Sequence, residues 1–374
     1  MRYPLALATA VLLTASLACG ASTGSPTPAP YIPPTHSIFD TGRTAYGFFP
    51  SPPEMTIESV MATIKGIGQH GDVLLVQRNV PWSDFVKSPD AASQDISDAR
   101  NMMILARQNN LEAVFVVDPL NGLNRRQFAG LPFGWQASFA NPDVRNAYTN
   151  YTLRILREFH PRYLGLASEI NTYADFQPND FPNFLSLYRD VYARVKAESP
   201  QTQVFVTFQW EELNNLIPGL PGGGKPYSPR WDQIKAFEPQ LDIWAISSYP
   251  FVALQHGKDI PADYYTPLLT QTTKPLAVAE GGFMSKDVAS FHGTPDDQLA
   301  YLNAIHTQIG SRLVFWIYLI YSDLNLDSYA KTMNSKGQQA DVNTLGWFVS
   351  VGLTNPDGSP KPALALWDGF RNNR

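Results

Sequence analysis

The sequence predicts an α/β fold, and specifically a single (β/α)₈ TIM barrel. From about residue 43, short apolar runs alternate with longer helical patterns, and eight such runs can be counted. This alternation is typical of parallel strands joined by right-handed crossover helices, and eight such units close most naturally into a barrel. No glycine-rich phosphate turn follows the first run, which argues against the alternative of a doubly wound open sheet.

Each element follows from its own pattern. The apolar runs predict eight strands: Ala45–Phe49, Val73–Gln77, Ala113–Asp118, Tyr163–Glu169, Val204–Trp210, Asp242–Tyr249, Leu276–Glu280 and Leu313–Tyr318. Helical periodicity predicts helices over Thr56–Gly68, Ile96–Gln108, Asp143–Phe159, Phe181–Glu198, Asp296–Ile309 and, closing the ring, Pro362–Phe370. Two of the helices begin with a capping residue followed by proline, at Asn141-Pro142 and Thr294-Pro295.

Composition limits the kind of partner. The chain has 374 residues, 44% of them hydrophobic and 16% charged, which is ample for one large core. Its formal net charge of −5 leaves no basic footprint and argues against nucleic acid as a partner. A neutral or weakly polar substrate suits this balance, and we expect a monomer.

The N-terminus indicates export. Arg2 precedes an apolar run from Leu5 to Leu17, so residues 1–18 resemble an export signal that is too short to span a bilayer permanently. The only cysteine, Cys19, ends this run, and Leu17-Ala18-Cys19-Gly20 resembles a lipobox. Two alternatives remain open: Cys19 is the lipid-attachment site of a bacterial lipoprotein at the cell surface or in the periplasm, or it lies beside an ordinary cleavage site of a secreted protein.

The segment between signal and barrel predicts a tether. Residues 19–42 are rich in Ser, Thr and Pro, a composition that stays extended and solvated. We therefore expect three parts: a signal over 1–18, a tether over 19–42 and one domain over 43–374. A lipid on Cys19 would be the only contact with a membrane.

Two glutamates end strands of the predicted barrel. Glu169 closes the fourth strand and Glu280 the seventh, and the active site of a TIM barrel lies at the carboxyl ends of its strands. Alternation along the strands places Glu169 with Gly165 and Ala167, facing the barrel axis. Alternation along the seventh strand likewise places Glu280 on the inner face. Both carboxylates are therefore predicted to project inward.

Two interpretations of this pair compete. Burying carboxylates among apolar residues is costly unless they are paired or used. They could be structural ion pairs, with Arg78 as a partner, or a general acid/base and a nucleophile flanking a glycosidic bond. In retaining glycosidases such groups lie about 5 to 5.5 Å apart.

The second interpretation is supported by a resemblance. Glutamates ending strands four and seven, here in Ala167-Ser168-Glu169 and Ala279-Glu280-Gly281, look like clan A of the retaining glycoside hydrolases. The resemblance implies that Glu169 is the acid/base and Glu280 the nucleophile. The clan usually has Asn before the acid/base, to hold the sugar 2-hydroxyl, where this chain has Ser168. Asn171 could substitute if its loop turns it back.

The same resemblance suggests supporting residues. Tyr249, ending strand six, resembles the tyrosine that hydrogen-bonds the nucleophile, and Trp316 on strand eight resembles the floor of the sugar site. Arg78 resembles the strand-two arginine that supports the nucleophile. Tyr249 could equally be an interface aromatic, and Trp316 a core aromatic.

Further polar and aromatic residues follow the strand ends. Asn79, Asp118 and Trp210 complete the predicted ring, and aromatic faces suit the apolar face of a sugar. Loop aromatics that could line a cleft, although each could equally be ordinary packing, are Trp82, Trp135, Tyr173, Phe176 and Phe251.

Other chemistries lack their motifs. The six histidines are scattered without metal-ligand spacing, and no Gly-x-Ser-x-Gly or Walker-type loop occurs, so we expect no metal and no cofactor. The sequence predicts a retaining β-glycosidase acting on a poly- or oligosaccharide. The alternatives are a non-catalytic carbohydrate-binding lipoprotein on the same barrel, and a barrel enzyme that uses the two carboxylates for other acid–base chemistry.

Overall fold

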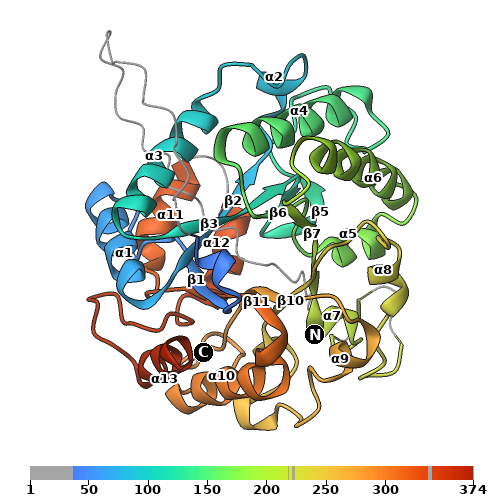
Figure 1. The fold of residues 1–374 in the computed structure, drawn as a ribbon. Helices are drawn as coiled ribbons and strands as arrows, with labels where there is room; N and C mark the ends of the chain where they lie inside the picture. Colours follow the sequence, from blue (N-terminus) through green and yellow to red (C-terminus); the bar gives the residue numbers. More distant parts are fainter. Residues whose placement is uncertain (1–36, 218, 221–223, 336–338, 374) are drawn as a thin grey trace.

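The computed structural model describes residues 37–217, 219–220, 224–335 and 339–373. Within them the main sheet has nine parallel strands in the order β7-β6-β3-β2-β1-β11-β10-β9-β8. The two ends of this order, β7 (Gln203–Phe205) and β8 (Thr207–Gln209), are consecutive pieces of one extended segment interrupted at Val206. The ends of the sheet therefore meet, and the strands form a barrel with helices around it (Figure 1). The predicted TIM barrel is confirmed.

The remaining strands lie close to their predicted positions. They are β1 (Ala45–Phe49), β2 (Val73–Asn79), β3 (Glu112–Asp118), β6 (Tyr163–Gly165), β9 (Trp244–Ser248), β10 (Leu276–Gly281) and β11 (Leu313–Ile320). The largest difference is at the fourth barrel strand, where regular pairing ends at Gly165, four residues before Glu169.

The long helices also match their predicted segments. They are α1 (Ile57–His70), α3 (Gln94–Gln108), α4 (Pro142–Phe159), α6 (Phe181–Glu198), α10 (Pro295–Ile309) and α13 (Pro362–Asn372). Asn141 and Thr294 accept hydrogen bonds from the first turns of α4 and α10, as their capping patterns predict. Shorter helices in the loops are α2 (Trp82–Phe85), α5 (Ile170–Phe176), α7 (Trp210–Leu213), α8 (Trp231–Lys235), α9 (Pro267–Gln271), α11 (Leu326–Ser335) and α12 (Gln339–Leu345).

Aromatic side chains fill the amino-terminal half of the barrel. The rings of Tyr163 and Phe205 lie 5.2 and 5.5 Å from that of Phe315, which reaches them from β11. Gly165 leaves space for this packing, since a Cβ there would lie 2.8 Å from Val116 and 2.9 Å from Phe205. The barrel is thus a packed core, and polar chemistry is confined to its ends.

The amino-terminal mouth is covered by a short 3₁₀ helix, η1 (Ile38–Thr41). Ser37 donates a hydrogen bond to Glu112 at 2.7 Å, and the ring of Phe39 packs edge-on against Tyr163 at 4.8 Å. Residues 37–42 therefore pack on the folded domain, in contrast to the tether expected over 19–42. The remainder of that segment, the signal and Cys19 lie outside the described residues.

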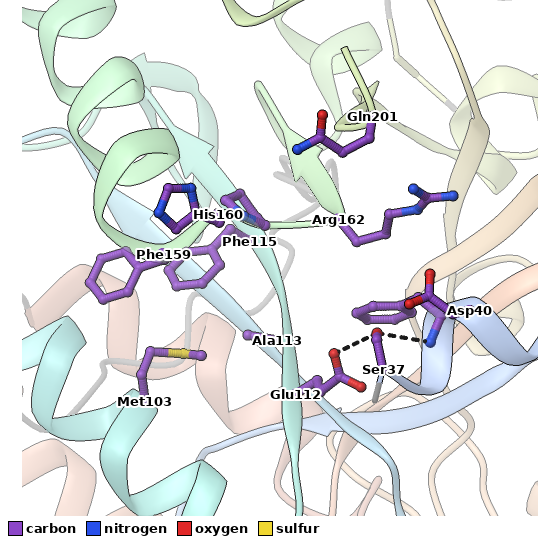
Figure 2. Close-up of a pocket in the computed structure, with 12 residues that line it drawn as sticks. Ser37, Asp40, Met103, Glu112, Ala113, Phe115, Phe159, His160, Arg162 and Gln201 are labelled. Carbon is purple, nitrogen blue, oxygen red and sulfur yellow. Dashed lines mark hydrogen bonds between the residues drawn. The ribbon is translucent and has the colours of Figure 1, made fainter. Parts of the chain in front are cut away.

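A pocket lies at this same mouth, away from the carboxyl ends of the strands. Figure 2 shows its lining, which includes Glu112 at the start of β3, His160 after α4 and Arg162 before β6. Because strands begin here, the pocket is at the opposite end of the barrel from Glu169 and Glu280.

A hairpin that the sequence analysis does not anticipate follows β3. Its strands are β4 (Leu120–Asn121) and β5 (Asn124–Phe128). Trp82 donates a hydrogen bond to the carbonyl of Ala129 at 2.7 Å, and Phe128 packs on Phe139 at 4.6 Å. These contacts anchor the hairpin beside the carboxyl end of the barrel.

Across the described ranges, none of the helices combines the length and the apolar character that crossing a membrane requires.

Candidate active site

Glu169 lies at the turn between the fourth barrel strand and α5. Its φ is 48°, a left-handed backbone conformation that is uncommon for residues other than glycine, asparagine and aspartate. The backbone N–H of Glu169 donates to Thr207 at 2.7 Å, which holds the turn, and Ser247 donates to the carboxylate. Such backbone strain is found most often at functional sites.

Glu280 lies within β10 and faces Glu169. Ser168 contacts its Oε1 atom at 3.0 Å and the hydroxyl of Tyr249 donates to its Oε2 atom at 3.3 Å. The Ser168 hydroxyl is also 3.1 Å from the amide oxygen of Gln77. Since a hydroxyl has one hydrogen, Ser168 donates to Glu280 when that carboxylate is ionised.

A buried arginine lies between the two glutamates. Arg125, on β5, pairs with Asp118, and its Nε lies 3.5 Å from Glu169 while its Nη2 lies 3.8 Å from Glu280. Asp118 is held in turn by the Gln77 amide at 2.7 Å. One guanidinium therefore contacts three carboxyl groups, all of them buried.

The two glutamates hold their protons differently. Burial raises the pKa of Glu169 well above its usual range, and the negative charge of Glu280 raises it further. Burial raises the pKa of Glu280 to about 7. The charge of Arg125 opposes this rise most strongly, and the hydrogen bonds from Ser168 and Tyr249 also lower this pKa. Because more donors face Glu280, the shared site places a proton on Glu169 first and the negative charge on Glu280.

Arg78 does not occupy the position that the sequence suggests. It pairs with Asp95 on α3, and Tyr151 on α4 donates to that same aspartate. On β2 it is Gln77 that contacts the site, and alternation directs the next residue to the helices. The expected support of Glu280 by Arg78 is therefore wrong, and Arg125 supplies a cation from a different element.

The two predicted tryptophans pack in the core. Trp316 faces the outer helices, with its ring 5.2 Å from that of Trp367 on α13. Trp210 is buried against Trp231 and Tyr265 at 6.0 Å from each. Neither forms the expected sugar platform, because strand alternation and the turn into α7 direct them outward.

The two predicted asparagines bind backbone. Asn171 exchanges hydrogen bonds with the main chain of Gln209, at 2.8 and 3.1 Å, so it does not turn back toward a sugar. Asn79 donates to the carbonyls of Asp118 and Leu120 at 3.1 Å each, which fixes the chain at the start of the hairpin. Asn171 therefore does not take the place of the asparagine that clan A usually has before the acid/base.

Three site residues escape the sequence analysis. Gln77 and Ser247 share the inward parity of their strands, Ser247 being two residues before Tyr249, so a stricter use of alternation could have found them. Arg125 gives no such signal, because its position depends on a hairpin whose two strands are short.

Among the described residues no group of three or more His, Cys, Asp or Glu side chains has the arrangement of a metal site.

Known proteins match this chain in structure only. No protein-family model matches the sequence, and no curated protein matches it. An exo-β-1,4-mannosidase from an Opitutaceae bacterium superimposes with a TM-score of 0.60 at 13% identity, over 88% of this chain and 59% of that one. The chain thus spans less than two thirds of that mannosidase.

Two further structures extend the comparison. A GH5_18 protein from Bifidobacterium longum matches with a TM-score of 0.61 at 12% identity, over 88% of this chain and 79% of that one. A family 39 glycoside hydrolase from Bacteroides cellulosilyticus matches with a TM-score of 0.53 at 15% identity, over 90% and 64%. At these identities the matches establish the fold, a TIM barrel like that of GH5 and family 39 glycoside hydrolases. The resemblance in architecture to clan A is confirmed.

Proposed function

We propose that the protein is a retaining glycoside hydrolase that cleaves β-glycosidic bonds of a poly- or oligosaccharide. The observation that carries this proposal is the pair of inward carboxyl groups, Glu169 and Glu280, which face one guanidinium and differ in proton affinity. Carboxyl groups with environments that push their pKa values apart are suited to separate acid and nucleophile roles.

The two steps follow from these environments. Glu280 attacks the anomeric carbon while Glu169 gives its proton to the departing oxygen, so the glycosidic bond breaks as a glycosyl ester forms. Glu169, now ionised, takes a proton from water, and the water oxygen attacks the anomeric carbon. The ester bond to Glu280 breaks, and both carboxyl groups return to their starting protonation.

The names of similar structures favour a β-linked substrate. They include an exo-β-1,4-mannosidase, a β-glucosidase and fungal β-1,4-galactanases, and one GH5_18 variant was solved in complex with Manβ1-4GlcNAc. These proteins share the bond type and differ in the sugar. We extend only the bond type to this chain, and leave mannosides, glucosides and galactosides as the substrates to screen.

Access to the carboxylates requires movement of what covers them. Glu169 and Glu280 expose 1% and 0% of their surface. Arg125 contacts both from the hairpin, and Phe348 packs on Tyr249 with ring centroids 5.2 Å apart. A glycoside therefore has to displace the segment that carries Phe348, because Asp118 holds Arg125 in place.

The decisive experiment is removal of the nucleophile. After a screen of aryl β-glycosides identifies a substrate, Glu280→Ala is expected to lower kcat by about 10⁴-fold or more, and azide is expected to restore part of the rate by attacking in place of the carboxylate. Glu112→Gln changes a glutamate at the opposite mouth and should leave kcat within about twofold of wild type.

Two outcomes would redirect the proposal. Unchanged turnover in Glu280→Ala would exclude Glu280 as nucleophile. A wild-type protein that binds oligosaccharides and hydrolyses none of them would instead be a carbohydrate-binding protein on the same barrel.

A further inference from the structure

We propose that Arg125 is a substrate-binding residue, whose Nε and Nη2 atoms donate hydrogen bonds to an uncharged oxygen of the sugar lying between Glu169 and Glu280. This inference rests on the proposed function and assigns a role to a residue outside the glutamate pair.

The first observation is a set of buried atoms without hydrogen bonds. Arg125 is fully buried, and neither its Nε nor its Nη2 has a hydrogen-bond partner among the described residues. The same holds for Oε2 of Glu169, the oxygen that Nε approaches. Buried polar atoms are nearly always hydrogen-bonded, so three such atoms on two neighbouring side chains indicate a place for a ligand oxygen.

The second observation is that the guanidinium is held in place. Asp118 binds the Nη1 end of Arg125, and Asp118 itself accepts hydrogen bonds from the Gln77 side chain at 2.7 Å and from the Leu120 backbone at 3.1 Å. The planar fork of arginine therefore keeps one orientation. Its two remaining donor atoms lie 3.5 Å from Glu169 and 3.8 Å from Glu280, near both carboxylates yet beyond hydrogen-bond length.

The third observation concerns the neighbouring polar residues. Ser168 is engaged with Gln77 and Glu280, and Asn171 with the backbone of Gln209. The donors that remain at the carboxylates belong to Arg125.

The local charge selects the kind of oxygen. Asp118, Glu169 and Glu280 surround a single cation, so the site is neutral or negative depending on the protons that the glutamates carry. A carboxylate or sulfate group on the sugar would be repelled by these acids. The substrate class that fits is a neutral glycoside, and the group that Arg125 contacts is a hydroxyl.

The test is a double-mutant cycle between protein and substrate. Arg125→Lys keeps a positive charge beside Asp118 and removes the fork. Using the aryl glycoside that wild type hydrolyses best, kcat/KM is expected to fall about 10- to 100-fold, the range for a hydrogen bond from a charged group. The matched control is Arg126→Met on the same hairpin, whose side chain lies over the ring of Phe176 at 3.5 Å, and its kcat/KM should stay within about twofold of wild type.

Substrate analogues identify the contact. Each sugar hydroxyl is replaced in turn by fluorine, and the loss in kcat/KM is compared between wild type and Arg125→Lys, so that the electronic effect of fluorine cancels in the ratio. At one position the loss is expected to be about 10-fold smaller in the variant, because the contact is already gone. If Arg125→Lys folds poorly, the double variant Asp118→Asn/Arg125→Met is used instead, because it removes both charges. It should show the same reduced loss in kcat/KM at that fluorinated position.

Equal losses at every position in both proteins would overturn the inference while leaving the two-glutamate function intact. If wild type hydrolyses no glycoside, the proposed function fails separately. The role of Arg125 then stands only if calorimetry with the same glycosides shows weaker binding by Arg125→Lys and unchanged binding by Arg126→Met.

Discussion

At the scale of single residues, Glu169 and Glu280 show how identical groups acquire different chemistry. Both are buried, and burial alone favours the protonated form of each. The difference comes from their neighbours, since Glu280 has Ser168 and Tyr249 as donors whereas Glu169 has Ser247. In the proposed mechanism, hydrogen bonds rather than depth in the barrel therefore distinguish the acid from the nucleophile.

Tyr249 gives a residue-scale prediction. Tyr249→Phe removes the donor to Oε2 of Glu280, and since that hydrogen bond lowers the pKa of Glu280, the acidic limb of the kcat/KM profile should move to higher pH. We expect kcat/KM at neutral pH to fall about 10-fold. Measurement of kcat/KM across pH checks this.

The matched control for Tyr249 is Tyr192→Phe. It removes a tyrosine–aspartate hydrogen bond to Asp242 on the outer side of the barrel, and should leave the profile in place. An unmoved acidic limb in Tyr249→Phe would show that the tyrosine does not tune Glu280.

At the scale of elements, one face of β2 points into the candidate site and the other face packs toward the outer helices. Gln77 faces the barrel interior and contacts Asp118 and Ser168, while Arg78 faces α3 and pairs with Asp95. The cation that reaches the glutamates comes instead from the β4–β5 hairpin. Loops of this kind vary without disturbing the barrel, which is how one fold supports different specificities.

Arg78 gives the prediction at this scale. Arg78→Met leaves Asp95 beside Tyr151 without its cation, and loss of one partner of a largely buried pair is expected to cost about 3 kcal/mol of unfolding free energy. The pH profile of kcat/KM should not move, because Arg78 pairs away from Glu280. Urea denaturation and the profile together check this, with Arg78→Lys as the milder variant. If Arg78→Met left the unfolding free energy unchanged and moved the acidic limb of the kcat/KM profile, Arg78 would support Glu280 as the sequence suggests.

At the scale of the whole molecule, burial of the glutamates at the candidate active site lowers the stability of the folded state. The pKa of Glu169 is well above its ordinary 4.5 in the folded protein, so between that value and the folded pKa the folded state binds more protons than the unfolded state. Stability therefore falls as pH rises through this range, and the contribution is fully present only below the unfolded pKa. Functional carboxyl groups in a packed core are destabilising at neutral pH for this reason.

Thermal unfolding across pH gives the corresponding prediction. Glu169→Gln carries no charge to bury, so its melting temperature should exceed that of wild type by at least about 2 °C at pH 8, with the gap closing toward pH 4. The matched control, Glu198→Gln, has the opposite sign. Its pairing with Arg157 lowers the pKa of Glu198, so this variant should lose a little stability at pH 8 and none at low pH. A pH-independent difference for Glu169→Gln would contradict the linkage.

Local patterns in the sequence are enough to predict the barrel and the glutamate pair. Strand and helix periodicities are local properties of the chain, and they located eight strands, six long helices and two inward carboxylates to within a few residues. Alternation also predicts Tyr249 and Gln77 on the inner face of the barrel and Arg78 on the outer face.

The side chains that complete the candidate site depend on contacts between segments that are distant in the sequence. Trp316 and Trp210 face helices because packing with residues distant in the sequence is available there. Arg125 reaches the glutamates because a hairpin folds over the strand ends and Asp118 holds its guanidinium. Such contacts join segments whose approach depends on the closed barrel, and no local pattern of residues encodes them.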